Sequence, residues 1–274
     1  MRIGVQVSYP RGLPKAIEEA GRAGLRCLQV FSRNPVGGQS QPLPTRESIR
    51  IPLSQWSISP FFVHAPYFVN PAALDPVKQE RAGIVLTQEM RRVKRLCGQY
   101  LVMHCGHASK LGLVEEGEAA LVKTLTAMLR APGRIVLENS GGQGNELGAD
   151  IEGLGRILAR LGRTRRVGVM LDTAHALAAG YPLSRESDFL ALWALVDRHI
   201  GLDRVIGIHL NDNPFPVGSH QDRHAHLLTG SLGEGALREL LAWANRRECP
   251  LLLETPGRTV DEREDDLRII KTLL

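Results

Sequence analysis

The chain has few cysteines and aromatic residues, and it has no long uncharged apolar run. Its four cysteines are Cys27, Cys97, Cys105 and Cys249, and none of them forms a Cys-x-x-Cys pair, so a reduced intracellular protein is favoured over a disulfide scaffold. No apolar run reaches the roughly 18 residues that a membrane span needs, and the N-terminus lacks the basic start and apolar core of a secretory signal. We therefore expect a cytoplasmic protein with no membrane partner.

Polar low-complexity tracts are also absent. Hydrophobic residues make up 43% and charged residues 23% of the chain, which is typical of a protein folded throughout. The formal net charge of +5 would favour an anionic partner without identifying it. A length of 274 residues is typical of a barrel of eight strands and eight helices, and no linker or internal repeat is visible. We predict one domain over residues 1–274.

Short apolar, β-branched runs recur along the chain and predict strands. There are eight of them: Ile3–Val7, Cys27–Phe31, Phe61–His64, Tyr100–His104, Ile135–Glu138, Val167–Asp172, Val205–Leu210 and Leu251–Glu254. Amphipathic stretches between them predict helices, among them Leu13–Ala23, Pro76–Leu96, Glu115–Leu129 and Leu237–Arg246, and the least distinct pattern is that of a second helix within Arg46–Ser54. Apolar strands that alternate with helices indicate parallel strands buried on both faces.

This alternation predicts an α/β protein with a (β/α)8 TIM barrel fold. A doubly wound open sheet is the alternative, but no glycine-rich dinucleotide fingerprint follows the first predicted strand. In a barrel of parallel strands all C-terminal strand ends lie on the same face. Residues that end different strands are therefore expected to meet around one pocket.

Polar residues that can bind metal ions stand at or next to the ends of six of the eight predicted strands: His64, His104, Glu138, Asp172, His209 and Glu254. Two motifs extend this set. The spacing in Asp172-Thr173-Ala174-His175 places both end residues on one side of a helical turn, and the spacing in Asp222-Arg223-His224 places both on one face of an extended segment. Each residue alone is more typical of a hydrogen-bonded structural group. Together, however, the four carboxylates would repel one another without cations.

Five imidazoles and four carboxylates are too many ligands for one tetrahedral ion, so two or three ions fit. Mixed ligands of this kind suit zinc, with manganese or iron as alternatives. Three divalent ions against four carboxylates leave about two positive charges, which would attract a phosphate. Such a site can activate a bridging hydroxide and stabilise a leaving oxygen.

Several longer motifs carry a resemblance to a known family. They are Val63-His64-Ala65-Pro66-Tyr67 with Asn70, Glu138-Asn139-Ser140 with Gly142-Gln143-Gly144, Leu171-Asp172-Thr173-Ala174-His175 with Ala179-Gly180-Tyr181, His209-Leu210-Asn211-Asp212, Asp222-Arg223-His224 and Leu253-Glu254-Thr255-Pro256. Through them the chain resembles the endonuclease IV family of apurinic/apyrimidinic endonucleases, within the xylose isomerase-like TIM barrel superfamily, over essentially its whole length.

The resemblance implies a monomeric enzyme of base excision repair that acts on double-stranded DNA with abasic sites. Three Zn²⁺ ions are expected, with Mn²⁺ as an alternative in some positions. The implied ligands are His64, His104 and Glu138 for one ion, Glu138, Asp172, His209 and Glu254 for the second, and His175, Asp222 and His224 for the third. Glu138, Asp172 and Glu254 are the implied catalytic carboxylates. A metal-bound hydroxide would attack the phosphate 5′ to the abasic sugar, leaving a 3′-hydroxyl and a 5′-deoxyribose phosphate.

The resemblance also implies DNA contacts by Asn34, Tyr67 and Asn70. The chain departs from the family after Asn34, where Pro35-Val36-Gly37-Gly38 stands at a place that usually carries an arginine entering the base stack. Tyr67 could instead pack on its own loop. His226 is an alternative ligand to His224, because in an extended segment it lies on the same face. Cys105 and His107, beside His104, are expected to support the site or pack.

Two other functions fit part of the pattern. A sugar isomerase or epimerase with one or two ions would use Glu138, Asp172, His209 and Glu254 but would leave five candidates unexplained. A relative that binds DNA without cleaving it is suggested by the departure at Pro35–Gly38.

Overall fold

The strands form a closed parallel barrel. The computed structural model describes residues 1–9, 12–38, 42–108, 113–162 and 164–274. Neighbouring strands pair in chain order, and β8 closes on β1 through pairs such as Ile3 with Leu251. The strands are β1 (Ile3–Gln6), β2 (Cys27–Phe31), β3 (Phe61–His64), β4 (Tyr100–His104), β5 (Ile135–Glu138), β6 (Val167–Asp172), β7 (Val205–His209) and β8 (Leu251–Leu253). The TIM barrel prediction is confirmed, and closure rules out the open sheet.

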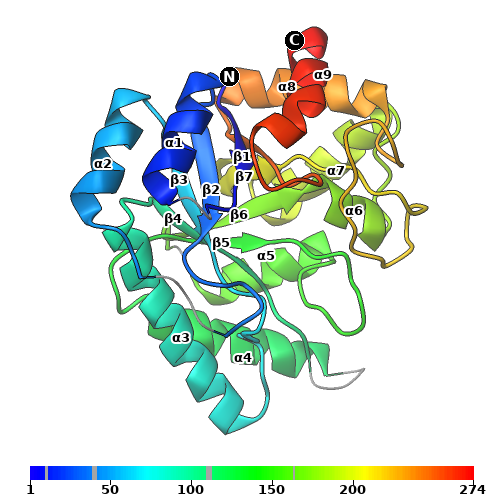
Figure 1. Cartoon of the computed structure of the whole chain (residues 1–274). Coiled ribbons are helices and arrows are strands. Elements are labelled where there is room, and N and C mark those ends of the chain that lie inside the picture. Colours follow the sequence, from blue (N-terminus) through cyan, green and yellow to red (C-terminus); the bar gives the residue numbers. More distant parts are fainter. Residues whose placement is uncertain (10–11, 39–41, 109–112, 163) are drawn as a thin grey trace.

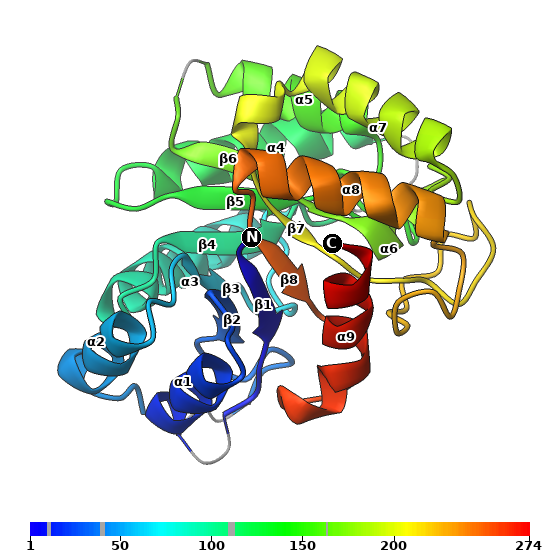
Figure 2. The same ribbon diagram turned by 90° about the horizontal axis from the view of Figure 1, so that it is seen from above.

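Helices surround the strands, and the two ends of the chain lie near each other in both views (Figures 1 and 2). The helices are α1 (Leu13–Arg22), α2 (Arg46–Gln55), α3 (Pro76–Arg95), α4 (Val114–Met128), α5 (Ile151–Arg160), α6 (Thr173–Ala179), α7 (Glu186–His199), α8 (Glu234–Arg247) and α9 (Glu264–Leu273), with 3₁₀ turns η1 (Leu202–Arg204) and η2 (Asp261–Arg263). None of the described helices is long and apolar enough to cross a membrane.

The predicted elements agree with the observed ones apart from their ends. Three strands stop one residue early, before Val7, Leu210 and Glu254. The backbone N–H of Val7 still donates to Gln29 O at 3.0 Å, and that of Leu210 donates to Leu252 O at 2.9 Å, so these residues continue the ladder by one bond. The least distinct helix, α2, is present and has Thr45 as its N-cap.

Side chains inside the barrel form two layers that follow the two-residue period of a strand. The lower layer is fully buried and apolar: Cys27, Phe62, Val102, Val136, Met170 and Leu252. The residues two positions later in the sequence, at or just after the ends of the same six strands, are all polar: Gln29, His64, His104, Glu138, Asp172 and Glu254. The polar layer therefore lies at the C-terminal mouth of the barrel, directly on an apolar floor.

An irregularity in β7 brings His209 into the polar layer. Val169 of β6 pairs with Val205, but Met170 pairs with Gly207, so Ile206 is an extra residue on β7. Ile206 packs against the apolar floor, and a side chain at Gly168 would collide with it at 2.3 Å. The bulge shifts the inward face of β7 by one residue, and His209 consequently points inward three residues after Ile206.

Candidate metal centre

The nine predicted ligand residues meet at the C-terminal mouth of the barrel. Three groups have ligand atoms within 4.8 Å of one another: His64, His104 and Glu138; Glu138, Asp172, His209 and Glu254; and Asp172, His175 and His224. Glu138 and Asp172 each belong to two groups. The ninth residue, Asp222, adjoins the third group, because its Oδ1 lies 3.3 Å from His175 Nε2 and 3.6 Å from His224 Nε2.

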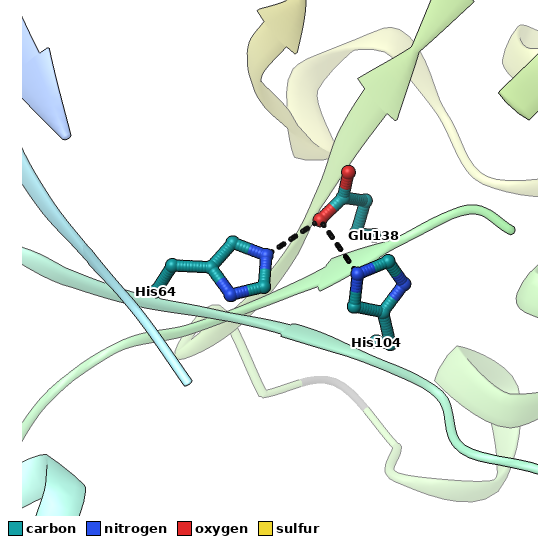
Figure 3. A group of neighbouring side chains, drawn as sticks. All are labelled: His64, His104 and Glu138. Atoms are coloured by element: carbon teal, nitrogen blue, oxygen red, sulfur yellow. Dashed lines mark hydrogen bonds and ion pairs between the residues drawn. The ribbon is translucent and has the colours of Figure 1, made fainter. Parts of the chain in front are cut away.

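Glu138 occupies the middle of the site, at the end of β5. Its Oε2 lies 3.0 Å from His64 Nε2 and 3.8 Å from His104 Nε2, and Figure 3 shows both rings pointing at this oxygen. Its Oε1 faces the other way, 2.7 Å from His209 Nδ1 and 3.4 Å from His175 Nδ1. The two oxygens of one carboxylate thus serve different groups, which is the arrangement of a bridging ligand.

Asp172 is placed for a similar bridging position by the start of α6. It ends β6 and caps α6, where its Oδ1 accepts the backbone N–H of His175 at 2.9 Å. Its Oδ2 is left to face the site, 3.8 Å from His209 Nδ1 and 3.6 Å from His224 Nε2. The turn into α6 also carries His175 back over Asp172, as the spacing of three predicts.

Three of the imidazoles are oriented by backbone carbonyls. Nδ1 of His64 donates to Ala65 O at 2.7 Å, Nδ1 of His175 to Asn139 O at 2.9 Å, and Nδ1 of His224 to Glu254 O at 3.2 Å. Each bond leaves Nε2 with its lone pair toward the site.

One of these ring nitrogens has no hydrogen-bond partner. Nε2 of His224 is buried and makes no hydrogen bond within the described part of the chain. Such an orphaned acceptor is costly inside a protein. A divalent ion between His224 and the facing carboxylates would satisfy it, so the residues present fit a metal.

The charges of the site favour cations. Burial raises the pKa of Glu138, but His209 and His104 outweigh burial and hold it well below its usual range. Burial lowers the pKa of His209, but Glu138 and Glu254 outweigh burial and raise it to about 9. Burial lowers the pKa of His104 to about 4, against the attraction of Glu138. Glu138 therefore stays ionised and favours a positive charge beside it, either as a proton on His209 or as a metal ion.

Three polar residues of the site have no role in the sequence analysis. Gln29 could have been found from the sequence, because it is the polar residue of the otherwise apolar strand β2. Asn211 donates to Asp172 Oδ2 at 2.7 Å and accepts the backbone N–H of Glu254 at 2.8 Å. Asn139 accepts the backbone N–H of Asp172 at 2.6 Å. These amides link ligand-bearing strand ends and carry no charge of their own.

The loop that carries His224 is held by Asp212. The backbone groups of Asp212 and Ala225 pair in both directions, at 2.8 and 3.3 Å. The Asp212 carboxylate accepts the N–H groups of Gly230 and Leu232 at 2.7 and 2.8 Å. His226 is directed elsewhere, because its Nδ1 lies 2.9 Å from the buried Asp266 of α9. The loop thus presents His224, and not His226, to the site.

This arrangement predicts different results for two neighbouring histidines. His224→Ala should lower the zinc content by about one ion per chain, because a ligand is lost. His226→Ala should leave the zinc content unchanged and lose at most about 1 kcal/mol of stability through the bond to Asp266. Elemental analysis and thermal unfolding of both variants check this. A loss of zinc from His226→Ala with none from His224→Ala would reverse the assignment.

Tyr67 and Asn70, two of the predicted DNA-contact residues, lie beside the candidate metal ligands or the loops next to them. Tyr67 is 54% exposed, and its ring centroid lies 5.6 Å from that of His64 and 5.8 Å from that of His104. It also contacts Phe31 edge-on at 5.2 Å, so it packs on its neighbours and still presents a face to solvent. The amide of Asn70 is engaged with the backbone of His107 in both directions, at 2.9 and 3.0 Å. Asn70 therefore positions the loop after β4, and a DNA contact by it stays a prediction.

The departure at Pro35–Gly38 forms a turn beside Tyr67. Asn34 Oδ1 accepts the backbone N–H of Val36 at 3.2 Å, and Pro35 O accepts that of Tyr67 at 2.9 Å. Val36 is 77% exposed. An exposed apolar side chain thus follows directly after the residue that contacts Tyr67.

A pocket opens between the candidate metal ligands and the loops at the barrel mouth. Among its lining residues are Tyr67, His104, His107, Glu146 and Asp222. The pocket places solvent, or a substrate, next to both the first and the third ligand groups.

Comparison with known proteins identifies the family. The family model described as xylose isomerase-like TIM barrel matches residues 17–273. A protein of Halorhodospira halophila named "Probable endonuclease 4" is 38% identical over 262 residues, which cover 93% of this chain and 88% of that protein. The chain belongs to the endonuclease IV family.

Two further members of the endonuclease IV family are similar to this chain over its full length. A "Probable endonuclease 4" of Moorella thermoacetica is 36% identical over 279 residues and covers 100% of this chain and 99% of its own. The crystal structure of endonuclease IV from Thermus thermophilus superimposes with a TM-score of 0.84 at 29% identity, covering 100% of this chain and 98% of that one. The likeness thus extends over the full length of the chain.

Proposed function

We propose that the protein is a zinc-dependent endonuclease of DNA repair that cleaves double-stranded DNA on the 5′ side of abasic sites. The observation that carries the proposal is that eight candidate ligand residues form three groups linked by Glu138 and Asp172, with Asp222 beside one of these groups. The names of its relatives support a nuclease activity on the same scaffold. A monomeric state, a cytoplasmic location and a single domain over residues 1–274 stay predictions.

Each ion has a defined set of proposed ligands. His64, His104 and Glu138 would hold the first ion, Glu138, Asp172, His209 and Glu254 the second, and His175, Asp222 and His224 the third, with Asp172 within reach of the third as well. Zn²⁺ is proposed for all three, with Mn²⁺ possible in some positions. When bound, the ions would supply positive charge to the phosphate and make water a stronger nucleophile.

The charge of the proposed site would favour a phosphate. Three divalent ions held by four carboxylates would leave about two positive charges at the pocket, which would favour an anionic substrate. Asp222 is the ligand nearest to solvent, with 37% of its side chain exposed, and it lines the pocket. The side chains of Glu138 and Asp172 are buried and that of Glu254 is nearly so, and all three are proposed as the catalytic carboxylates that hold the ions in place.

Substrate contacts are proposed for the rim of this pocket. Tyr67 presents an aromatic face that can stack on a base or sugar next to the lesion. Asn34 and Asn70 shape the neighbouring loops and are proposed as further DNA contacts. Val36 lies where an apolar side chain could enter a base step, so insertion at this position would be apolar instead of cationic.

The isomerase alternative explains less of the site. Its four-residue set of Glu138, Asp172, His209 and Glu254 is indeed one of the three groups. One oxygen of Glu138, Oε2, is however directed at two imidazoles outside that set, those of His64 and His104. A single-ion proton-transfer site has no use for these additional ligands.

The proposal is tested with a duplex that carries one abasic analogue, alongside the same duplex without the lesion. We expect the protein to cut only the damaged strand, on the 5′ side of the lesion, and to leave a 3′-hydroxyl. The position of the cut is measured on a sequencing gel, and the metal content of the same protein preparation is measured by elemental analysis. Intact damaged DNA with fully metallated protein would support the non-cleaving alternative, and conversion of a free sugar would support the isomerase.

A further inference from the structure

A glutamine of β2 contacts two of the proposed metal ligands. We propose that Gln29 is a positioning residue of the metal centre, which turns His209 Nδ1 toward the ions and keeps one oxygen of Glu254 away from them. The inference rests on the proposed metal centre. It adds a residue that ligates no ion itself.

Gln29 is fully buried in the polar layer of the barrel. Its Nε2 lies 2.7 Å from Glu254 Oε1 and 2.6 Å from Gln6 Oε1. Its Oε1 lies 3.0 Å from His209 Nε2. β2 carries none of the nine proposed ligands. Gln29 links this strand to His209 of β7 and to Glu254, which follows β8.

The chemistry of these partners decides which way the amide points. An ionised carboxylate only accepts hydrogen bonds, so the group that faces Glu254 must be the NH₂ of Gln29. Its two protons then bond to Glu254 and Gln6. The carbonyl oxygen of Gln29 is left facing His209 and can only accept, so His209 Nε2 must carry a proton.

This hydrogen-bond network selects the metal-binding form of His209. With the proton on Nε2, neutral His209 has its lone pair on Nδ1. That nitrogen lies among three carboxylate oxygens, 2.7 Å from Glu138 Oε1, 3.3 Å from Glu254 Oε2 and 3.8 Å from Asp172 Oδ2. Because Glu254 Oε1 is engaged by Gln29, its other oxygen Oε2 is the one presented to the same ion.

Gln29→Met tests this role, because methionine has a similar length and makes no strong hydrogen bond. We expect the affinity for one of the zinc ions to fall about 10- to 100-fold, as is usual when the partner of a metal ligand is lost. Competition with a chromogenic chelator measures it. Gln6→Met is the matched control, since among the described residues Gln6 hydrogen-bonds Gln29 and not His209 or Glu254. It should keep the zinc affinity of the parent.

A spectroscopic readout separates positioning from a general loss of packing. In the zinc-loaded parent, the His209 Nε2–H proton bonded to Gln29 should give a slowly exchanging, downfield imidazole resonance, which Gln29→Met should lose. If Gln29→Met does not fold, Gln29→Glu carries the test, because its carboxylate still accepts this proton. The Glu variant should keep the resonance, and its disappearance there would overturn the assignment.

The outcomes for the two proposals are distinct. A folded Gln29→Met with the parent's zinc affinities would overturn the role of Gln29 and leave the metal centre intact. A parent protein that binds no zinc would instead overturn the proposed centre.

Discussion

Glu138→Gln is expected to reduce cleavage of abasic DNA by at least about 10³-fold, which corresponds to roughly 4 kcal/mol of transition-state stabilisation. The amide keeps the shape of the side chain but removes the charge that two groups of ligands share. One of its ends would also present an N–H to the His64 and His104 rings or to His209, where an acceptor is needed. Single-turnover cleavage of the damaged duplex measures the effect.

The same variant should remain folded, because it replaces a buried charge by a neutral group of equal size. Circular dichroism and thermal unfolding check this. Glu146→Gln is the matched control, since Glu146 lines the same pocket but belongs to none of the three ligand groups. It should retain most of the activity. Near-normal turnover of Glu138→Gln would show that the carboxylate has been assigned the wrong role.

Removal of the metal should abolish cleavage altogether, and readdition of zinc should restore it. The native protein is expected to contain about three zinc ions per chain, because nine ligands at three or four per ion are present and two of them bridge. Dialysis against a chelator, followed by elemental analysis and the cleavage assay on the same sample, measures both quantities.

Several results of this experiment are informative. Magnesium offers a control, because it prefers oxygen ligands and should not restore activity at a site with five imidazoles. A reproducible content of about one zinc ion would favour the single-metal isomerase set of Glu138, Asp172, His209 and Glu254. Cleavage that persists in fully stripped protein would contradict the proposed mechanism.

The barrel topology explains why so many candidate ligands from distant parts of the sequence lie close together. Parallel strands place every C-terminal end on one face, and the two-residue period puts a polar side chain directly above each apolar residue of the floor. Gln29 extends this pattern to β2, and Gln6 hydrogen-bonds to it from β1. The apolar layer below excludes water, which strengthens each electrostatic contact in the site.

The sequence by itself determined the barrel and the candidate ligands. Apolar runs at regular intervals identified all eight strands to within one residue, because strand formation and burial depend on local composition and period. Polar residues at strand ends identified six of the nine ligand candidates, since the parallel topology brings those ends together. The spacing of two motifs added His175, Asp222 and His224.

Only the tertiary structure decided how these residues are shared and oriented. Nothing local indicates that β7 contains a bulge that turns His209 inward, or that Asp266 of α9 draws His226 away from the site. The role of Gln29 likewise depends on Glu254, 225 positions later in the chain. Hydrogen bonds between distant strands and helices set these features, and such contacts leave no periodic pattern in the sequence around either partner.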